Sequence, residues 1–94
     1  MDFSSVHNVN EKSVYQAVSL MSDKYPGVSA SEDLLADVAC VALNKIAPRY
    51  VRHDVDLAFF QTAKEHLALE RAICEAVDQA FGFVQARHAM RARR

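Results

Sequence analysis

The sequence predicts a mainly α-helical domain of three helices, with a short two-stranded β insert after the second helix. Apolar residues recur every three or four positions over three long stretches, which is the spacing of a helix face. Each stretch follows a capping motif, and only between the second and third does the pattern change to short β-branched and aromatic runs. Only two Gly and two Pro interrupt a chain that is 51% hydrophobic, as expected for an ordered helical domain.

The first helix is expected at about residues 9–24. Asn8 stands three positions before Glu11, which is the spacing of an N-cap and its reciprocal acid. The next apolar positions step by four, three and four residues and form one helix face: Val14, Val18, Met21 and Tyr25. We expect Pro26-Gly27 to end this helix.

The second helix is expected to begin at a capping box, Ser29-x-x-Glu32, and to run to about Ala47. Its centre, residues 38–43, is an unbroken apolar run with no polar face. Such a helix is typical of a core element, so we expect burial on nearly all sides. Pro48 ends it, because the residue before a proline is pushed out of helical geometry.

Two brief extended segments are expected next, at about 49–52 and 57–60, pairing as a hairpin around His53-Asp54. The third helix is expected at about 63–86, behind a capping box that begins at Thr62. Gly82 lies inside it and indicates either a close helix–helix approach or a fraying point. Residues 87–94 hold four Arg and are expected to form a basic, solvated tail, either disordered or as a continuation of the third helix. Such a tail would bind nucleic acid only weakly and non-specifically.

The whole chain, residues 1–94, is expected to be a single domain whose core covers about 7–86. So much apolar surface in so short a chain favours a two-fold homodimer. Cys40 and Cys74 lie in apolar runs and are expected to be buried and unpaired. No signal peptide or membrane-spanning stretch is seen, so we expect a cytoplasmic protein without a membrane partner. Without a Gly-rich phosphate loop, HExxH motif or nucleophile elbow, we do not expect an enzyme.

A short basic segment, residues 48–54 and called the elbow below, is the first candidate binding site. Two arginines flank a tyrosine there, and guanidinium groups suit phosphate oxygens and the O6/N7 edge of guanine, while a tyrosine ring offers a stacking face. Alternatively, the arginines are solvated or pair with Asp54 and Asp56, and the tyrosine packs in the core. The candidate ligand-binding residues, in the elbow and the turn before it, are Asn44, Lys45, Arg49, Tyr50, Arg52, His53 and Asp54.

A metal site in the elbow is not expected. Its imidazole and carboxylates lie in one short run, His53-Asp54-Val55-Asp56, in which only alternate residues share a face. No fourth ligand stands out elsewhere in the sequence, and Asp54 suits a turn or capping position better.

The stretch DVACVALNKIAPRYVRHDVDLAFF, residues 37–60, resembles the signature of the late competence development protein ComFB family. The shared pattern is a helix ending in A-L-N-[KR]-x-x-P-x-Y-[VI], and the similarity extends over about residues 7–84. Some members carry a zinc-binding Cys cluster before the second helix, but here that region reads VSASEDLLAD, so no zinc is expected.

The resemblance implies a small, non-enzymatic homodimeric receptor for cyclic di-nucleotides, chiefly cyclic di-GMP, that signals to an unidentified downstream protein. Arg49, Tyr50 and Arg52 are the first candidates for its ligand contacts because they lie within the matching motif. The alternative is a ligand-free helical interaction module related to competence or motility. A nucleic-acid accessory protein acting through the Arg-rich tail is a third, weaker hypothesis.

Overall fold

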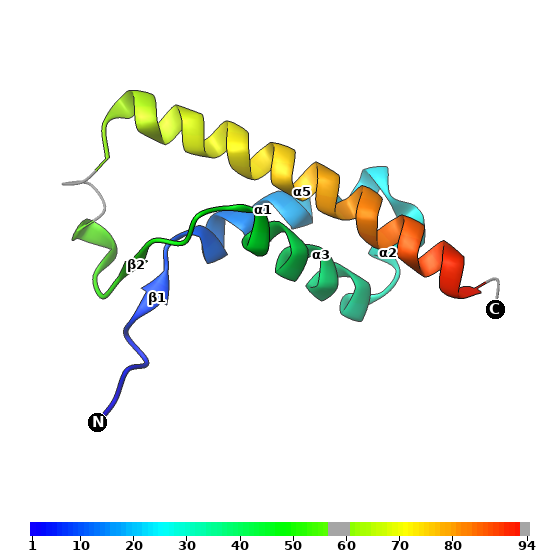
Figure 1. Cartoon of the computed structure of the whole chain (residues 1–94), viewed down its shortest axis with the longest axis horizontal. Helices are drawn as coiled ribbons and strands as arrows, with labels where there is room; N and C mark the ends of the chain where they lie inside the picture. Colours follow the sequence, from blue (N-terminus) through cyan, green and yellow to red (C-terminus); the bar gives the residue numbers. More distant parts are fainter. Residues whose placement is uncertain (57–60, 93–94) are drawn as a thin grey trace.

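The computed structural model describes residues 1–56 and 61–92, and these form a mainly α-helical fold (Figure 1). Three long helices, as predicted, and one short helix are present in the described part of the chain: α1 (Asn10–Met21), α2 (Pro26–Ser29), α3 (Glu32–Lys45) and α5 (Ala63–Ala92). Two strands, β1 (His7–Asn8) and β2 (Tyr50–Val51), form an antiparallel pair. Two 3₁₀ turns, η1 (Ser22–Lys24) and η2 (Asp54–Asp56), complete the described elements.

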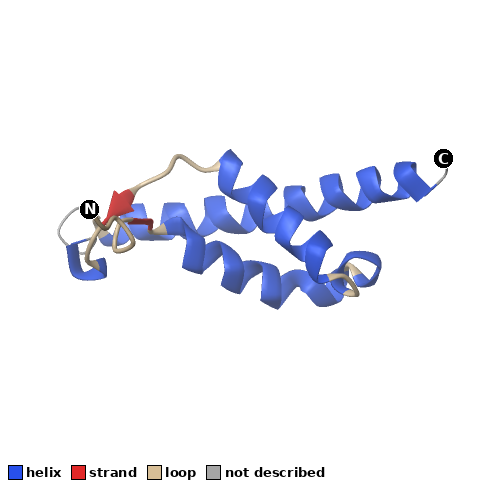
Figure 2. Ribbon diagram, turned by 90° about the horizontal axis from the view of Figure 1, so that it is seen from below, coloured by secondary structure: helices blue, strands red, loops and turns tan. Residues whose placement is uncertain are grey.

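Helix α5 is the element on which the other helices pack. It runs along the molecule with α1 and α3 beneath it, and the strand pair and the C-terminus lie at opposite ends (Figures 1 and 2). Its buried side chains all lie between Ile73 and Val84. Residues 63–72 contribute no fully buried side chain, and Leu69 packs only partly against the core, so the first part of α5, residues 63–68, extends beyond it.

The core consists mainly of valine and alanine from all four helices around one large side chain, Phe81, which is completely buried. Tyr25 lies between η1 and α2, and its ring stacks on Phe81 with 4.6 Å between centroids. The Tyr25 hydroxyl donates a 2.5 Å hydrogen bond to Asp78 Oδ1. One tyrosine therefore ties the connection between α1 and α3 to the middle of α5.

The predicted end of the first helix is only partly right. Helix α1 stops at Met21, the η1 turn follows, and Pro26 begins helix α2 instead of only ending the helix before it. A proline suits the first helical position because its missing N–H would have no partner there. The N-cap position of α1 is held by Val9, not Asn8, but the Asn8 side chain still accepts the N–H of Asn10, the first residue of the helix.

The second helix begins two residues later than expected. Ser31, not Ser29, is its N-cap, and the Ser31 hydroxyl accepts the Leu34 N–H at 3.2 Å. Burial on nearly all sides is only partly right for the protomer: α3 buries Val38, Ala39 and Ala42, and Val41 and Leu43 pack partly against the core, but Cys40 is exposed. Both cysteines, Cys40 and Cys74, are free, but both are exposed, so the expected burial is wrong.

The extended segment expected at 49–52 is confirmed at Tyr50–Val51, but its partner in the described structure is β1. The register pairs His7 with Val51 and Asn8 with Tyr50. The other expected strand, 57–60, lies outside the described residues. The sheet therefore joins the elbow to the segment that precedes the first helix, and is not an insert confined to the stretch after α3.

The third helix begins as predicted, with the Thr62 hydroxyl accepting the Glu65 N–H at 3.1 Å. It continues to Ala92, so most of the expected tail is helical, and Arg87 contacts Asp37 at 3.4 Å and the ring of Phe83 at 5.4 Å. Gly82 is neither a close approach nor a fraying point: the helix runs through it, and a Cβ there would meet no atom within 4 Å. Across residues 1–56 and 61–92, no helix is long and apolar enough to cross a membrane.

Candidate functional site

The backbone at the start of the elbow is fixed by Asn8, which is 7% exposed. Its side-chain Oδ1 accepts two backbone N–H groups, those of Asn10 and Arg49, both at 3.2 Å. The Val9 N–H completes the connection by donating to the Arg49 carbonyl oxygen at 2.9 Å. Asn8 therefore acts as a bridge between the start of α1 and the elbow, 41 residues further along the chain.

A second buried asparagine holds the residues just before the elbow. Asn10 is 2% exposed, and its Nδ2 donates to the Ala47 carbonyl oxygen at 3.1 Å. This carbonyl precedes Pro48, where the chain has left α3. Sequence reasoning assigned Asn8 only the role of a helix cap and did not single out Asn10. The only signal was two asparagines, two positions apart, directly before a helix.

The side chains of Arg49, Tyr50 and Arg52 are exposed, and Tyr50 is 64% exposed. The alternative that places Tyr50 in the core is therefore wrong. Among the described residues, neither arginine forms an ion pair with Asp54 or Asp56. Neighbouring strand residues point to opposite faces, and Val51, next to Tyr50, is half-buried. The elbow thus presents solvated guanidinium groups and one aromatic ring on a short strand.

The other predicted site residues differ from one another in the contacts that they make. Asn44 is exposed, but its Nδ2 donates to the Cys40 carbonyl oxygen at 2.9 Å, one turn back in its own helix. Lys45 ends α3 and is exposed, as is His53. Asp54 begins η2, where its carboxylate contacts His7. The structure therefore brings the candidates into one region of the surface, although Asn44 and Asp54 are engaged in contacts of their own.

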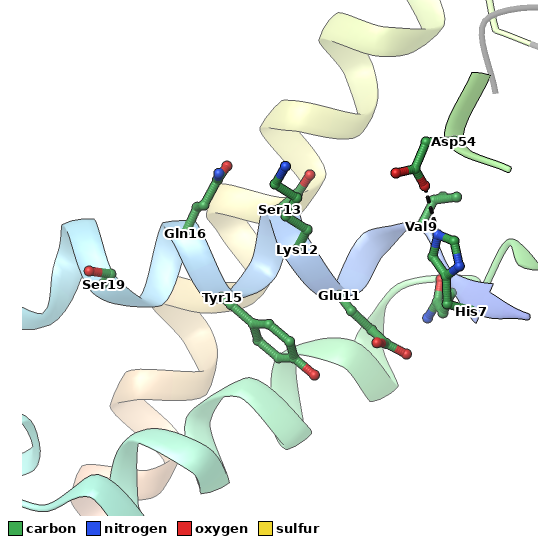
Figure 3. A pocket seen from close by; sticks show the side chains of 10 residues that line it. His7, Val9, Glu11, Lys12, Ser13, Tyr15, Gln16, Ser19 and Asp54 are labelled. Atoms are coloured by element: carbon green, nitrogen blue, oxygen red, sulfur yellow. Dashed lines mark hydrogen bonds and ion pairs between the residues drawn. The ribbon is translucent and has the colours of Figure 1, made fainter. Parts of the chain in front are cut away.

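His7, which the sequence did not single out as a site residue, makes two hydrogen bonds through its ring (Figure 3). Its Nε2 lies 2.7 Å from Asp54 Oδ1, and its Nδ1 lies 2.9 Å from the Ser5 carbonyl oxygen. The Ser5 carbonyl raises the pKa of His7 most, and Asp54 adds to the effect. This pair connects β1 to the end of the elbow.

A groove of about 660 Å³ runs from this pair along the outer face of α1. In Figure 3, Glu11 and Tyr15 project to one side of α1, while Ser13 and Gln16 project to the other. Asp54 is the only predicted site residue that lines this groove. The half-exposed Tyr15 was a possible signal for it, because a large aromatic side chain stands there outside the apolar face of the first helix.

Residues 1–56 and 61–92 contain no group of three or more His, Cys, Asp or Glu side chains arranged to hold a metal ion. The side chains present at the site can make charge, hydrogen-bond and stacking contacts. The elbow provides cationic donors and an aromatic face, and the groove beside it provides carboxylates, hydroxyls and the ring of Tyr15.

Comparison with known proteins gives one match. The family model described as late competence development protein ComFB matches residues 7–88, which include β1, the three long helices to within a few residues of the end of α5, and the entire elbow. No curated protein and no solved structure matches the chain.

Proposed function

The chain belongs to the late competence development protein ComFB family, and on that premise we propose that it is a non-enzymatic signalling receptor for a cyclic di-nucleotide. Cyclic di-GMP is the ligand we propose first. The elbow is its binding surface, a homodimer is the binding form, and a downstream protein reads the bound state.

The observation that carries this proposal is the state of the elbow before any ligand is bound. Its backbone is fixed by the two N–H groups on Asn8 Oδ1 and by the strand pair, whereas Arg49, Tyr50 and Arg52 face solvent. A fixed backbone lowers the ordering cost of binding, and unpaired guanidinium groups need not break an ion pair first. Arginines placed in this way suit phosphate oxygens and the O6/N7 edge of guanine.

The symmetry of the ligand favours a dimer as the binding form. Cyclic di-GMP has two phosphates and two guanines related by a two-fold axis, so two elbows would offer it matched contacts. A micromolar affinity corresponds to about −8 kcal/mol. A few charge-assisted hydrogen bonds at about 1.5–3 kcal/mol each, together with base stacking, are sufficient after ordering costs.

The protomer also exposes apolar side chains that a second copy would cover. Leu20, Leu67, Phe83 and Met90 are each more than half exposed, and residues 63–72 of α5 contribute no fully buried side chain. Large exposed apolar surface is uncommon on monomeric proteins and is typical of interaction sites. This supports the homodimer.

Calorimetric titration with cyclic di-GMP tests the proposal, with cyclic di-AMP and GTP as controls. We expect saturable micromolar binding and a stoichiometry of one ligand per two protomers. Arg49→Ala and Arg52→Ala should abolish binding while circular dichroism and size-exclusion profiles stay unchanged. Lys24→Ala is the control, because Lys24 is an exposed cation in η1, outside both the elbow and the exposed part of α5. If both elbow variants lose the fold, their arginines are structural and the assignment of the site is wrong.

A second candidate function is supported by the same exposed apolar side chains: a helical interaction module that docks another protein without a small ligand. This module would be favoured if none of the three nucleotides gave a measurable heat of binding while size-exclusion chromatography showed an intact dimer. A partner that is recovered only in the presence of cyclic di-GMP would count against it.

A further inference from the structure

We infer that His7 is an imidazolium that clamps the end of the elbow to strand β1, and that Asp54 is a positioning residue acting through this clamp. The position of the elbow then depends on pH. The consequence for ligand affinity rests on the proposed function, but the clamp itself does not.

Both ring nitrogens of His7 face hydrogen-bond acceptors. Nδ1 lies 2.9 Å from the Ser5 carbonyl oxygen, which can only accept a hydrogen bond. Nε2 lies 2.7 Å from Asp54 Oδ1, and an ionised carboxylate also only accepts. A neutral imidazole carries one N–H, so its other nitrogen would set a lone pair against an oxygen lone pair. Only the doubly protonated ring satisfies both contacts.

The charges around the ring agree with this assignment. Asp54 faces it from η2 and Glu11 from α1, and both raise the pKa of His7, although the Ser5 carbonyl contributes most. The nearby cations are Lys12, which lines the same groove on α1, and the two arginines beside β2. His7 keeps 35% of its side chain exposed and Asp54 keeps 83%, so solvent protons reach the pair freely.

The sign of the pH dependence follows from the raised pKa. A histidine with a higher pKa in the folded protein stabilises the fold fully below its unfolded pKa. That contribution disappears as the pH rises through the folded pKa. The clamp therefore holds both contacts in mildly acidic solution and weakens as the pH rises through the folded pKa, because one N–H then remains for two acceptors.

The clamp matters because the strand pair that it supports is only two residues long. Such short pairs are marginal unless neighbouring contacts hold them. Asn8 fixes the elbow at Arg49, and the contact between His7 and Asp54 fixes it three residues beyond the end of β2. Arg52 lies between these two anchors, so its backbone position depends on both.

Loss of one proton from the His7 ring also affects the groove. His7 and Asp54 both line it, at the end nearest the elbow (Figure 3). When the ring loses one proton, its charge attraction to Asp54 is lost, and the one N–H that remains cannot serve both Asp54 Oδ1 and the Ser5 carbonyl oxygen, so the hold on this wall weakens. One proton thus alters two neighbouring surfaces together.

The test measures the pKa and protonation of His7 by NMR in the wild type, Asp54→Asn and Asp56→Asn. An asparagine can present either its oxygen or its NH₂ to the ring, so it no longer requires the second proton, and the pKa of His7 should fall in Asp54→Asn. Asp56→Asn is the matched control: it removes one negative charge from the same turn, and Asp56 does not contact His7. The wild-type ring should carry both protons at about pH 6.

Two further readouts separate the clamp from a merely structural role. Amide hydrogen exchange in β2 should be faster in Asp54→Asn than in Asp56→Asn at one mildly acidic pH, and this difference should shrink at alkaline pH. Cyclic di-GMP affinity should fall with rising pH in the wild type and in Asp56→Asn, but not in Asp54→Asn. An equal pKa of His7 in all three proteins, or a neutral wild-type ring at about pH 6, overturns the clamp. Absence of any nucleotide binding, with the pKa difference intact, overturns only the proposed function.

Discussion

Replacing Asn8 with alanine should destabilise the protein and release the elbow, because this one side chain serves two distant backbone donors. Asn8 Oδ1 accepts the N–H groups of Asn10 and Arg49, both at 3.2 Å, and Asn8 is 7% exposed. The substitution leaves both donors without a partner. Each unsatisfied buried donor costs about 1–3 kcal/mol.

The two donors do not contribute equally. Asn10 is 2% exposed, so water cannot replace its lost partner, and its N–H carries the full cost. Arg49 is an exposed residue, and water can partly satisfy its N–H. We therefore expect a loss of about 2 kcal/mol in the free energy of unfolding. For a domain of this size that corresponds to a fall in Tm of about 8–16 °C.

Urea denaturation followed by circular dichroism measures this loss, at one fixed protein concentration because dimerisation would couple stability to concentration. Asn8→Asp is the matched variant, because its carboxylate keeps an acceptor at the same place. It should retain most of the stability that Asn8→Ala loses. Amide exchange at Arg49 should be faster only in the alanine variant. An Asn8→Ala midpoint equal to that of the wild type, or an equal loss in both variants, would refute the bridging role.

Three further substitutions test the core and the long helix. Gly82→Ala should raise the free energy of unfolding by about 1 kcal/mol in urea denaturation, because the helix runs through Gly82 and a Cβ there would meet no atom within 4 Å. A lower midpoint would mean that a second copy packs closely there. Tyr25→Phe should lose about 1 kcal/mol at neutral pH. The hydrogen bond to Asp78 raises the pKa of Tyr25 in the folded protein. The bond therefore contributes fully to the free energy of unfolding below the pKa that Tyr25 has in the unfolded chain. The wild-type advantage should therefore shrink as the pH rises through the folded pKa, and a constant difference would exclude the bond as its source. Phe81→Ala should cost about 3–5 kcal/mol in the same denaturation assay because Phe81 is completely buried, and a small loss would show that the core collapses around the gap.

The helices could be predicted because their signals are local. Apolar spacing and a cap lie within a few residues of each other, and the Thr62 cap was identified correctly. The start of α3 shows the limit of such signals. Ser29 and Ser31 both precede an acidic first turn, and only the fold of α2 decides that Ser31 becomes the cap.

The elbow could be predicted as a surface but not as a structure. Its residue types indicated an exposed cationic segment, and Arg49, Tyr50 and Arg52 are indeed exposed. What holds it depends on contacts between distant parts of the chain: His7 reaches Asp54 across 47 positions, and Asn8 reaches Arg49 across 41. No local pattern encodes such pairs, so Asn8 resembled an ordinary helix cap.

We predicted burial of the second helix on nearly all sides, and this prediction is only partly right for a physical reason. An apolar run predicts every surface that a helix covers in its final assembly, whereas the protomer fully covers only the face of α3 that contains Val38 and Ala42 and covers Val41 and Leu43 in part. Cys40 is left exposed on that helix, and Leu67 is left exposed where α5 extends beyond the core. Uncovered apolar surface costs about 25 cal/mol for each Å² kept in water. A second copy that covers these faces would account for the apolar side chains that the protomer leaves exposed. It would also bring two elbows into the same dimer, as a two-fold symmetric ligand requires.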